Sequence, residues 1–409
     1  MEQWISENIE KMEAVAHEGI CDRCLGRMFG KLSTGMTNDI RGSMIRDALR
    51  ENGVDIPSPD ECPLCDDVFE SLDIFAEAVA EKVVDVESDN FLVGCKVDPA
   101  MLKMEKEIVE RHGLDKFESI KTELNRELGK VALPMIHRPV EFKNPQCGAC
   151  VDVRFADVTL DLSPIFIKGR YTKLSREIPQ TIWPCRMCHG KGCPRCNGTG
   201  KMYQTSVQEI IGDIALEMCQ GKEHFFHGMG REDIDALCLG EGRPFVLEIS
   251  QPKRRDIDLD ELEMVANQSE LAHYHRLQFT ERAEFQRTKT ATPSKTYRVT
   301  VKADSKVNKE RVVEVALSFK NVHLNQRTPK RVEHRRADLV RDREILWVEA
   351  EVTGEDTFDL TLETESGTYV KEFVSGDNGR CTPSFSEALG IQCYVQTLDV
   401  IAINNEGMK

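Results

Sequence analysis

Residues 227–235 read His227-Gly228-Met229-Gly230-Arg231-Glu232-Asp233-Ile234-Asp235, and they lead through Gly240-Glu241-Gly242-Arg243-Pro244 into the apolar run Phe245–Ile249. A short apolar run bounded by proline predicts a buried strand. Glycines permit backbone angles that other residues avoid, and they let a partner approach closely. Carboxylates on such a loop could act as nucleophile, acid or base, although the same residue types also form ordinary solvated turns.

Periodicity on both sides of this loop predicts a large mixed domain. Ser206-Val-Gln-Glu209 is a capping box, and a row of apolar residues at helical spacing follows it. Beyond the loop, residues 259–275 are expected to be helical and residues 279–294 to form a polar, mobile loop. Alternating patterns predict further strands, which cover residues 296–302, 345–353, 358–364 and 391–403.

The part of the chain before this domain has a mixed pattern as well. Helical periodicity covers residues 2–18, 37–51, 101–112 and 116–130. Phe91–Val97 predicts a strand, and Val151–Leu162 alternates like a single half-buried strand. Pro164–Lys168 is expected to extend the same sheet, which makes this region an α+β domain.

Fifteen cysteines are many for a chain of 409 residues. Their odd number, the C-x-x-C pairs and the absence of an export signal favour metal thiolates over disulfides. Two quartets have the spacing of structural zinc sites, with four reduced cysteines in a small core as the alternative. Cys147 and Cys150 have no obvious partner pair, so we expect core or edge cysteines there. The proposed zinc ligands are Cys21, Cys24, Cys62 and Cys65, and Cys185, Cys188, Cys193 and Cys196.

The formal net charge is −16, but the charges are unevenly distributed. Residues 281–343 contain 17 Lys and Arg against 8 Asp and Glu, and a basic segment on an acidic chain can still bind phosphates. A second basic segment, residues 169–184, contains Tyr and Trp, which suits base stacking. A solvated face and a surface linker are the alternatives. The residues proposed to bind RNA are Arg170, Lys173, Arg176, Arg327, Lys330, Arg331, Arg335 and Arg336.

Composition and missing motifs exclude several classes of protein. No apolar run approaches the roughly 18 residues that span a membrane, and the acidic N-terminus does not resemble a signal peptide, so we expect a cytoplasmic protein. No strand leads into G-x-G-x-x-G and no P-loop occurs, which argues against a nucleotide cofactor. Four-cysteine sites leave no open coordination position, and H-E-x-x-H is absent, so a zinc hydrolase is not expected.

At this point the motifs carry a resemblance. Gly230-Arg231-Glu232-Asp233 resembles the G-R-x-D loop of RNA pseudouridine synthases, and Gly367-Thr368-Tyr369-Val370-Lys371 resembles a G-T-Y-[IV]-[RK] strand in several of their families. The longer pattern, with K-x-Y and R-V-x-H-R-R-A-D between these motifs, is similar to one family. In archaea that family makes pseudouridine at uridines 54 and 55 of tRNA. The N-terminal half also fits, through its zinc knuckles, its THUMP-like region and G-R-Y-x-K-L-x-R-x-I-P-Q-T-x-W-P-C.

The resemblance implies roles for individual residues. Asp233 corresponds to the covalent nucleophile, and Lys371 to the basic residue that pairs with it. Arg231 is implied to contact phosphate or fill the space of a flipped base, while Tyr297 and Tyr369 line the uracil pocket. Asp235 is the alternative nucleophile within the sequence, but in an extended loop it would face the other way. Core tyrosines and a surface lysine are the alternative interpretation.

The expected protein is a monomer that binds the T-arm of tRNA, needs no cofactor for catalysis and holds one or two structural zinc ions. The fold expected is α+β, with a catalytic domain built on a mixed, mainly antiparallel sheet flanked by helices. One departure from the family pattern is Leu237, where an Arg is usual. A catalytically silent RNA-binding protein, or another THUMP-containing tRNA modifier, is the alternative. The expected domains are a zinc-knuckle segment (1–66), a THUMP-like domain (67–180), a second zinc module (181–204) and the catalytic domain (205–409).

Overall fold

The computed structural model describes residues 2–404, apart from the side chain of Arg335. The chain forms two compact units, Met1–Ser163 with Lys253–Arg255, and Pro164–Pro252 with Asp256–Lys409. Each unit has its own hydrophobic core. Within residues 2–404 no helix is long and apolar enough to cross a membrane.

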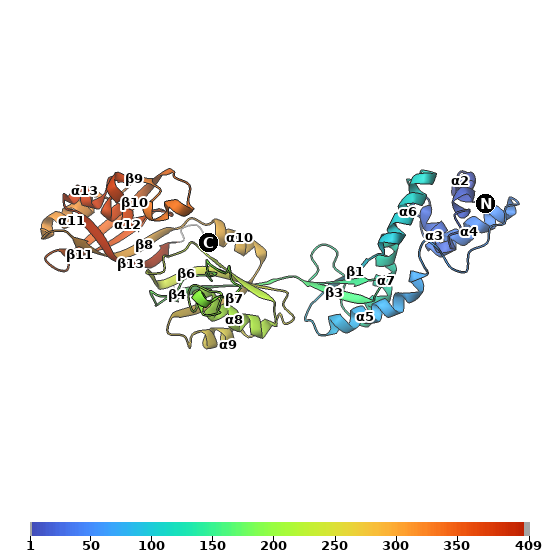
Figure 1. Ribbon diagram of the computed structural model, residues 1–409, viewed down its shortest axis with the longest axis horizontal. Helices are drawn as coiled ribbons and strands as arrows, with labels where there is room; N and C mark the ends of the chain where they lie inside the picture. The colour runs from blue at the N-terminus through green and yellow to red at the C-terminus, as the bar shows by residue number, and fades with distance from the viewer. Residues whose placement is uncertain (1, 405–409) are drawn as a thin grey trace. The chain divides into compact units, whose positions relative to one another are not determined.

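The first unit combines helices with a small sheet of order β1-β2-β3 (Figure 1). β1 pairs with β2 in parallel, and β2 forms an antiparallel hairpin with β3. α5 packs against β2 and β3, and α7 packs against β1. The elements of this unit are α1 (Gln3–Ser6), α2 (Ile9–Ala16), α3 (Asp22–Met28), α4 (Asn38–Glu51), η1 (Val68–Ser71), α5 (Leu72–Val84), β1 (Phe91–Lys96), α6 (Pro99–His112), α7 (Ile120–Ile136), β2 (Cys147–Asp152) and β3 (Asp157–Leu162).

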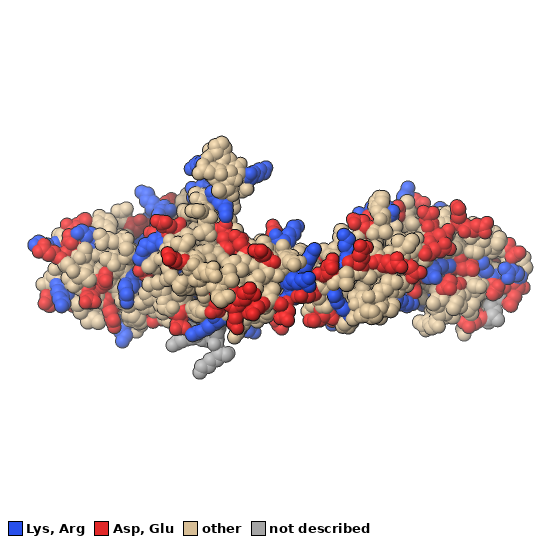
Figure 2. Space-filling view, turned by 90° about the horizontal axis from the view of Figure 1, so that it is seen from below, with Lys and Arg blue, Asp and Glu red and all other residues tan. Residues whose placement is uncertain are grey.

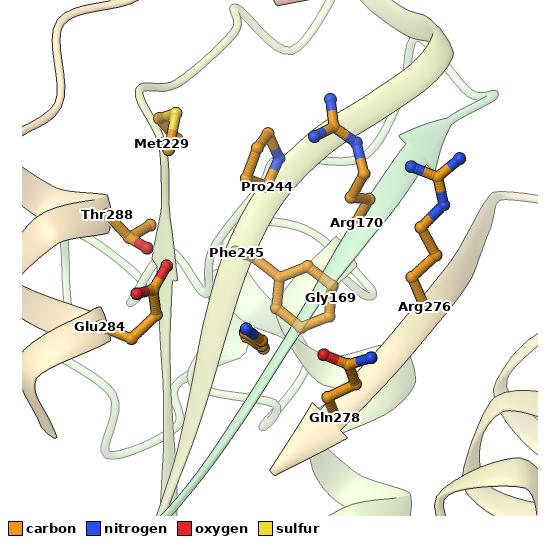
Figure 3. A pocket seen from close by; sticks show the side chains of 10 residues that line it. Gly169, Arg170, Met229, Pro244, Phe245, Arg276, Gln278, Glu284 and Thr288 are labelled. Carbon is orange, nitrogen blue, oxygen red and sulfur yellow. The ribbon is translucent and has the colours of Figure 1, made fainter. Parts of the chain in front are cut away.

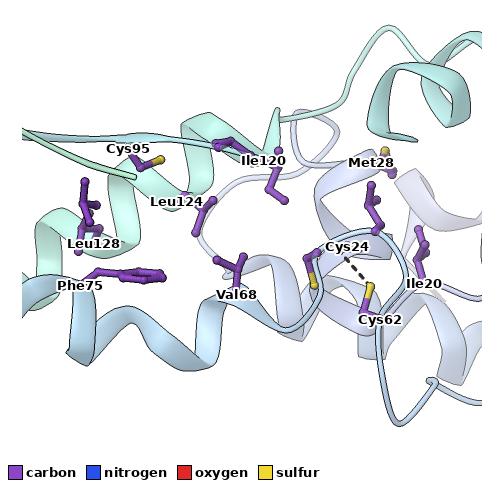
Figure 4. Packing of buried hydrophobic residues seen from close by; sticks show 14 of the residues in the cluster. Ile20, Cys24, Met28, Cys62, Val68, Phe75, Cys95, Ile120, Leu124 and Leu128 are labelled. Carbon is purple, nitrogen blue, oxygen red and sulfur yellow. Dashed lines mark hydrogen bonds between the residues drawn. The ribbon is translucent and has the colours of Figure 1, made fainter. Parts of the chain in front are cut away.

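The core of the first unit includes thiols of the first cysteine quartet. Figure 4 shows Cys24 and Cys62 close together beside Ile20 and Met28, with the two sulfur atoms 3.7 Å apart. All four of these residues are at most 2% exposed. The quartet therefore joins the N-terminal helices to the segment that leads into α5.

The second unit is built on one large mixed sheet of order β12-β9-β10-β11-β8-β13-β6-β4-β7, with β5 paired to β6. Its strands are β4 (Ile165–Lys173), β5 (Glu223–Gly228), β6 (Leu237–Ser250), β7 (Ala272–Thr280), β8 (Ser294–Ala303), β9 (Val322–Arg327), β10 (Val340–Val352), β11 (Thr357–Thr364), β12 (Cys381–Thr382) and β13 (Cys393–Asn404). Its helices are η2 (Pro194–Cys196), α8 (Val207–Cys219), α9 (Leu259–Ala266), α10 (Arg282–Thr290), α11 (Lys309–Ser318), η3 (Lys330–Arg335), α12 (Val370–Ser375), η4 (Asp377–Gly379) and α13 (Phe385–Leu389).

Two helical groups cover this sheet and bury two separate cores (Figure 1). α8 and α9 pack on the half formed by β4, β6 and β7, while α11, α12 and α13 belong to the half formed by β8 to β11. The halves meet where β6 runs parallel to β13, in the pairs Leu237–Asp399 and Val400–Cys238. This junction places the start of β6, and the loop before it, at the middle of the sheet.

The fold class predicted from the sequence is confirmed: the sheet is mixed, mainly antiparallel and flanked by helices. The buried strand at Phe245–Ile249 lies within β6. Ser206 is the N-cap of α8 and its hydroxyl accepts a bond from the Glu209 amide, but the predicted capping box is formed only in part, since the Glu209 carboxylate accepts from the Ser206 hydroxyl and not from its backbone amide. The helices expected at 37–51 and 101–112 are α4 and α6, which begins at Pro99.

Two predictions about strands before residue 175 were wrong. Val151–Leu162 is the end of one strand, a turn and a second strand, because Ala156 takes a left-handed conformation (φ 51°) and reverses the chain. Alternation of polar and apolar residues continues through this turn, so the pattern does not mark it. Pro164–Lys168 does not extend the small sheet, since β4 pairs with β6 and β7. The boundary between the two compact units falls at residues 163 and 164.

Two further predictions were wrong between residues 259 and 294. The helix expected over 259–275 ends at Ala266, because both side-chain atoms of the Asn267 amide bond the backbone of Tyr274 and fold the chain into β7. The expected mobile loop contains α10. This helix is polar and has few inward residues to reveal it, chiefly Phe285, whose ring packs on Phe166 and on His227.

Candidate functional site

The loop of residues 229–236 connects β5 to β6 at the central junction of the sheet. Gly230 has a left-handed conformation (φ 80°), which favours glycine. A Cβ atom at this position would lie 3.1 Å from the guanidinium of Arg243 and 3.2 Å from Nζ of Lys295. Two cations therefore pack directly beneath the loop.

A cavity of about 190 Å³ opens beside this loop. All five residues to which the resemblance assigns a role in catalysis or in binding the flipped uridine line this cavity. β8 contributes Lys295 and Tyr297, and the basic segment before β10 contributes Arg331 and Arg336. The complete lining comprises Arg231, Glu232, Asp233, Arg243, Lys295, Tyr297, Arg331, Val332, Arg336, Gly367, Thr368, Tyr369, Val370, Lys371, Leu398 and Val400.

Asp233 faces two cations at the edge of the cavity. Its Oδ2 atom lies 3.2 Å from Arg331 and 3.7 Å from Nζ of Lys371. The shorter contact of Lys371 is to Asp235, at 2.8 Å. The expectation that Asp235 faces away was wrong, because side chains two residues apart in an extended chain point to the same side. Both carboxylates lie near the same lysine, Lys371.

Asp233 and Asp235 nevertheless differ in their surroundings. Asp233 lines the cavity, whereas Asp235 does not and its side chain is 67% exposed. Partial burial would raise the pKa of Asp235, but the hydrogen bond and charge of Lys371 outweigh it and hold this pKa below its usual value. Asp235 therefore keeps its charge as a partner of Lys371.

Tyr297 and Tyr369 both line the cavity, from different elements. Burial raises the pKa of Tyr297 to about 12, so its ring stays neutral. The Tyr369 hydroxyl accepts a hydrogen bond of 3.3 Å from Arg336. The strand expected over 367–371 is absent: Tyr369 precedes α12, and Lys371 lies in its first turn. Lys371 therefore reaches the carboxylates from a helix, because the chain turns at Gly367, which has a φ of 85°.

Arg231 lies at the exposed end of the loop. Its guanidinium stacks over the ring of Trp183, 5.0 Å from the ring centre, and Tyr203 meets the same tryptophan edge-on at 5.6 Å. Leu237, the departure from the family pattern, is the first residue of β6, and its amide donates to Asp399. This amide contact involves no Leu237 side-chain atom.

A buried polar layer holds the loop from below. Glu232 forms a salt bridge of 2.9 Å with Arg243, and both side chains are at most 1% exposed. The hydroxyl of Tyr171 donates to the Glu232 carboxylate at 2.9 and 3.0 Å. Arg243 also donates to the Met229 carbonyl, and Gln180 donates to the Gly230 carbonyl. The loop backbone is therefore fixed by side chains from β4, β6 and the segment after β4.

The structure contradicts the predicted contact of Lys173 with RNA. Lys173 is completely buried, and its ammonium donates to three carbonyls, those of Ser175, Ile178 and Ile234. Those acceptors use all three of its protons. The interleaved basic and aromatic residues of this segment therefore serve partly to position the loop, a function that composition alone does not distinguish from RNA contact.

Arg170 and Arg176 also bond the protein. Arg170 donates to the carbonyls of Glu241 and Gly242, and Arg176 donates to the Asp235 carbonyl and the Asp399 carboxylate. Figure 3 shows Arg170 beside Arg276 at a second cavity, of about 280 Å³. Met229 also lines this second cavity, which shares no lining residue with the cavity beside Asp233.

The basic residues between Arg327 and Arg336 contact several different partners. Arg327 pairs with Asp338 at 2.5 Å, and Arg331 pairs with Glu372 at 2.7 Å as well as with Asp233. The Lys330 side chain is exposed, and that of Arg335 lies outside the described part of the structure. On the face shown in Figure 2, Lys and Arg side chains are interspersed with Asp and Glu.

The sequence did not single out Lys295, Glu232 or Arg243, although each lies in a quoted motif. Lys295 opens K-x-Y, to which only Tyr297 was given a role. Glu232 was set aside as a neighbour of Asp233, and Arg243 lies in the second glycine-rich turn. One signal in the sequence could have indicated these three residues. They are charged and lie next to segments predicted to be buried strands, and a charge that becomes buried usually pairs with another charge.

Both predicted cysteine quartets assemble. In each, the four sulfur atoms lie within 4.8 Å of one another. Individual separations are 3.8 Å for Cys21–Cys65 and for Cys188–Cys196, and 3.9 Å for Cys185–Cys193. Tetrahedral zinc with bonds of about 2.3 Å requires sulfur atoms about 3.8 Å apart. Both groups can therefore hold a structural zinc ion, and Cys147 and Cys150 belong to neither.

Native mass spectrometry is expected to find two zinc ions per chain. Replacing Cys24 and Cys65 together with serine should leave one ion and destabilise the first unit, because zinc binding at a thiolate site contributes directly to folding. Cys150→Ser is the matched control: Cys150 is exposed, lies outside both quartets and should leave the count at two. A wild-type protein that binds one ion or none would contradict the prediction.

Comparison with known proteins identifies the family. The family model described as Pus10, C-terminal, matches residues 166–404, and the model described as Pus10 THUMP domain, archaeal, matches residues 75–152. The tRNA pseudouridine synthase Pus10 of Methanothermobacter marburgensis is 40% identical, over 98% of this chain and 98% of its own. The enzyme of the same name from Pyrococcus furiosus is 38% identical over 97% of each chain.

Solved structures give a weaker likeness. A Cbf5-Nop10-Gar1 complex aligns with a TM-score of 0.31 and 14% identity, over 47% of this chain and 44% of that one, which is too distant to support an argument. The chain belongs to the Pus10 family of tRNA pseudouridine synthases.

Proposed function

We propose that this chain isomerises uridine to pseudouridine in the T-arm of tRNA, at uridine 54, uridine 55 or both, with Asp233 as the nucleophile. One observation carries the assignment of Asp233. Among the described residues that line the cavity, the carboxylates are Glu232 and Asp233. Glu232 is fully buried against Arg243, whereas the Asp233 side chain is 42% exposed and can meet a substrate.

The reaction needs no external reactant. The bond between N1 of uracil and C1′ of ribose breaks, the base rotates, and C5 bonds to C1′. If Asp233 attacks C1′, one difficult step becomes two easier ones. Arg331 and Lys371 orient the attacking carboxylate, because both cations approach Oδ2.

A uridine inside folded tRNA must leave its stack before it can enter this cavity. Arg231 and Trp183 supply a cation and an aromatic ring at the exposed end of the loop. These groups suit contact with the phosphate of the flipped nucleotide and stacking on a neighbouring base. The protein is expected to act as a monomer in the cytoplasm.

The test is chemical mapping of pseudouridine on unmodified tRNA transcripts. One transcript carries both T-arm uridines, and two others carry cytidine in place of uridine 54 or uridine 55. Product at either position supports the proposal, and the single-uridine transcripts show which position is used. Product only outside the T-arm would contradict the proposed site of action, while no product at all would favour the catalytically silent alternative.

Cations of the basic segment that leads to β10 should carry part of the affinity for tRNA. Replacing Lys330, Arg335 and Arg336 with alanine is expected to weaken binding and to lower the salt-dependence slope by up to about 3, since each lost phosphate contact removes somewhat less than one unit. The measurement is the Kd at several salt concentrations. A triple alanine variant of Lys306, Lys309 and Lys320, which are exposed and do not line the cavity, changes the net charge equally and should keep the slope. An unchanged slope in the first variant would make this run a solvated face.

A further inference from the structure

We propose that Lys295 is a further catalytic residue, whose ammonium donates a hydrogen bond to a carbonyl oxygen of uracil and stabilises the anionic base formed when the glycosidic bond breaks. The inference rests on the proposed function of the same cavity. It assigns a role to a side chain that lies on neither the nucleophile's loop nor the basic segment.

Lys295 is placed to meet the edge of a bound base. It lies on β8 two residues before Tyr297, so both side chains point to the same side of the strand, and both line the cavity. A uracil stacked on the Tyr297 ring would direct its edge along the strand. The carbonyl oxygens O2 and O4 lie on that edge, within reach of a long, flexible lysine side chain.

Lys295 is a buried residue of the cavity lining. The residue is only 9% exposed, and its ammonium lies 3.4 Å from the hydroxyl of Ser366 and packs beneath Gly230. An ammonium group has three protons to donate. The contact with Ser366 is a long one, so the ammonium retains donor capacity for a ligand that enters the cavity.

The charges at the bottom of the cavity do not balance. Two buried cations, Arg243 and Lys295, face a single buried carboxylate, Glu232, among the described lining residues. Glu232 is already in a salt bridge with Arg243 and accepts two contacts from Tyr171. Asp233 pairs at the cavity edge with Arg331 and Lys371. One positive charge is therefore left over where the base would lie, and an anion that forms during the reaction would complete the pairing.

The reaction supplies such an anion. When the Asp233 carboxylate oxygen bonds to C1′, the electron pair of the C1′–N1 bond stays on the base. The negative charge of the departing uracil is shared between N1 and the two carbonyl oxygens. A hydrogen bond from Lys295 becomes stronger as this charge develops, which lowers the barrier more than it favours substrate binding. The charge leaves the base when C5 bonds to C1′ and the Asp233 carboxylate departs with the electron pair of its bond to C1′. C5 then loses its proton and N1 gains one, which gives neutral pseudouridine.

The state of Lys295 supports the assignment. Burial, together with the charge of Arg243, lowers the pKa of Lys295 to about 8, while Glu232 opposes the shift. The other charged or titratable side chains around the cavity are Arg231, Asp233, Tyr297, Arg331, Arg336, Tyr369 and Lys371. The free enzyme therefore holds a protonated Lys295 at neutral pH, and kcat/KM should fall as pH rises through about 8.

The test compares Lys295→Met, Lys295→Arg and the control Lys302→Met in single-turnover assays on a T-arm RNA. Lys302 lies on the same strand but forms a partly exposed pair with Asp356, away from the cavity. We expect Lys295→Met to lower the rate constant about 10²- to 10³-fold, as loss of an oxyanion donor does, with a Kd within threefold of the wild type. Lys295→Arg should keep more activity than Lys295→Met and lose the fall above pH 8. Lys302→Met should match the wild type.

A second substrate separates catalysis from a purely structural role. Fluorine at C5 of uracil withdraws electrons and makes the base a better leaving group, so consumption of 5-fluorouridine in the same RNA should depend less on Lys295. A smaller defect of Lys295→Met on the fluorinated RNA supports the proposal. Equal defects on both RNAs, an unchanged pH profile in Lys295→Arg, or a rate within threefold of the wild type in Lys295→Met would overturn it. Failure of the wild type itself to make pseudouridine would instead refute the proposed function.

Discussion

Asp233→Asn is expected to lower the single-turnover rate of pseudouridine formation by at least about 10⁴-fold, because loss of a covalent nucleophile removes the main chemical route. The amide has nearly the same size as the carboxylate, but it cannot attack C1′. Asp233 is not part of the buried layer, so the variant should fold normally and bind tRNA with a Kd within threefold of the wild type. The measurements are chemical mapping of the product and a direct binding assay.

Asp235→Asn is the matched control for this experiment. Asp235 lies two residues away, shares Lys371 with Asp233 and does not line the cavity. Its replacement frees Lys371 to pair more closely with Asp233, so we expect less than about a tenfold change in rate. A variant of Asp233 that keeps its turnover would remove the nucleophile assignment. Loss of activity in the Asp235 variant alone would transfer the role to that residue.

Much of this site could be predicted because its parts lie in short sequence motifs. Asp233, Tyr297 and Tyr369 belong to three separate segments, and the resemblance placed all three in one pocket, where the structure brings them together. The cysteine quartets were predictable for a related reason, since metal geometry requires two close pairs of thiolates. In both cases the chemistry restricts the sequence locally.

Contacts set by the tertiary fold could not be predicted in the same way. Lys173 belongs to a segment whose composition suits RNA, and only the pairing of β4 with β6 reveals that its ammonium points inward. Arg331 was assigned to RNA from the charge of its neighbours, yet it is the nearest cation to Asp233. The first part of β4, within Pro164–Lys168, was recognised as a strand, but a strand pattern does not say which sheet the strand will join.

Lys295 and Arg243 show the same limit for buried charges. Each precedes or follows residues with clear motif matches, and neither position looks unusual in the sequence. The roles of Lys295 and Arg243 in the site depend on their burial together beside Glu232. They lie on strands β8 and β6, which are far apart in the chain. Such a cluster follows from the meeting of the two halves of the sheet, which no local pattern encodes.

The buried layer beneath the loop should be as sensitive as the nucleophile, but in stability. Glu232→Gln is expected to lower the free energy of unfolding of the second unit by about 3–5 kcal/mol, the usual cost of removing one partner of a buried ion pair. Arg243 and Lys295 would remain buried without an anion, and the new amide would direct its own donors at Arg243 and Tyr171. Activity should fall as well, since Arg243 and Gln180 hold the carbonyls of Met229 and Gly230.

Denaturant unfolding followed by tryptophan fluorescence or circular dichroism measures this effect. Glu241→Gln is the matched control, because its salt bridge with Arg276 has both side chains at least 65% exposed and should contribute less than about 1 kcal/mol. A double variant, Glu232→Gln with Arg243→Met, removes both charges. It should be less destabilised than the sum of the two single variants, because neither side chain then leaves an unpaired charge on the other.

The cycle decides whether the layer acts as a coupled pair or as two independent packing residues. Additive losses would mean that Glu232 and Arg243 stabilise the unit through separate contacts. A Glu232→Gln variant as stable as the wild type would show that Tyr171 and the neighbouring amides can satisfy a neutral side chain there. Coupling of the expected sign would mean that the charge of Glu232 helps to position Asp233, the next residue. Glu232 then anchors the loop inside the protein and leaves Asp233 at the cavity edge.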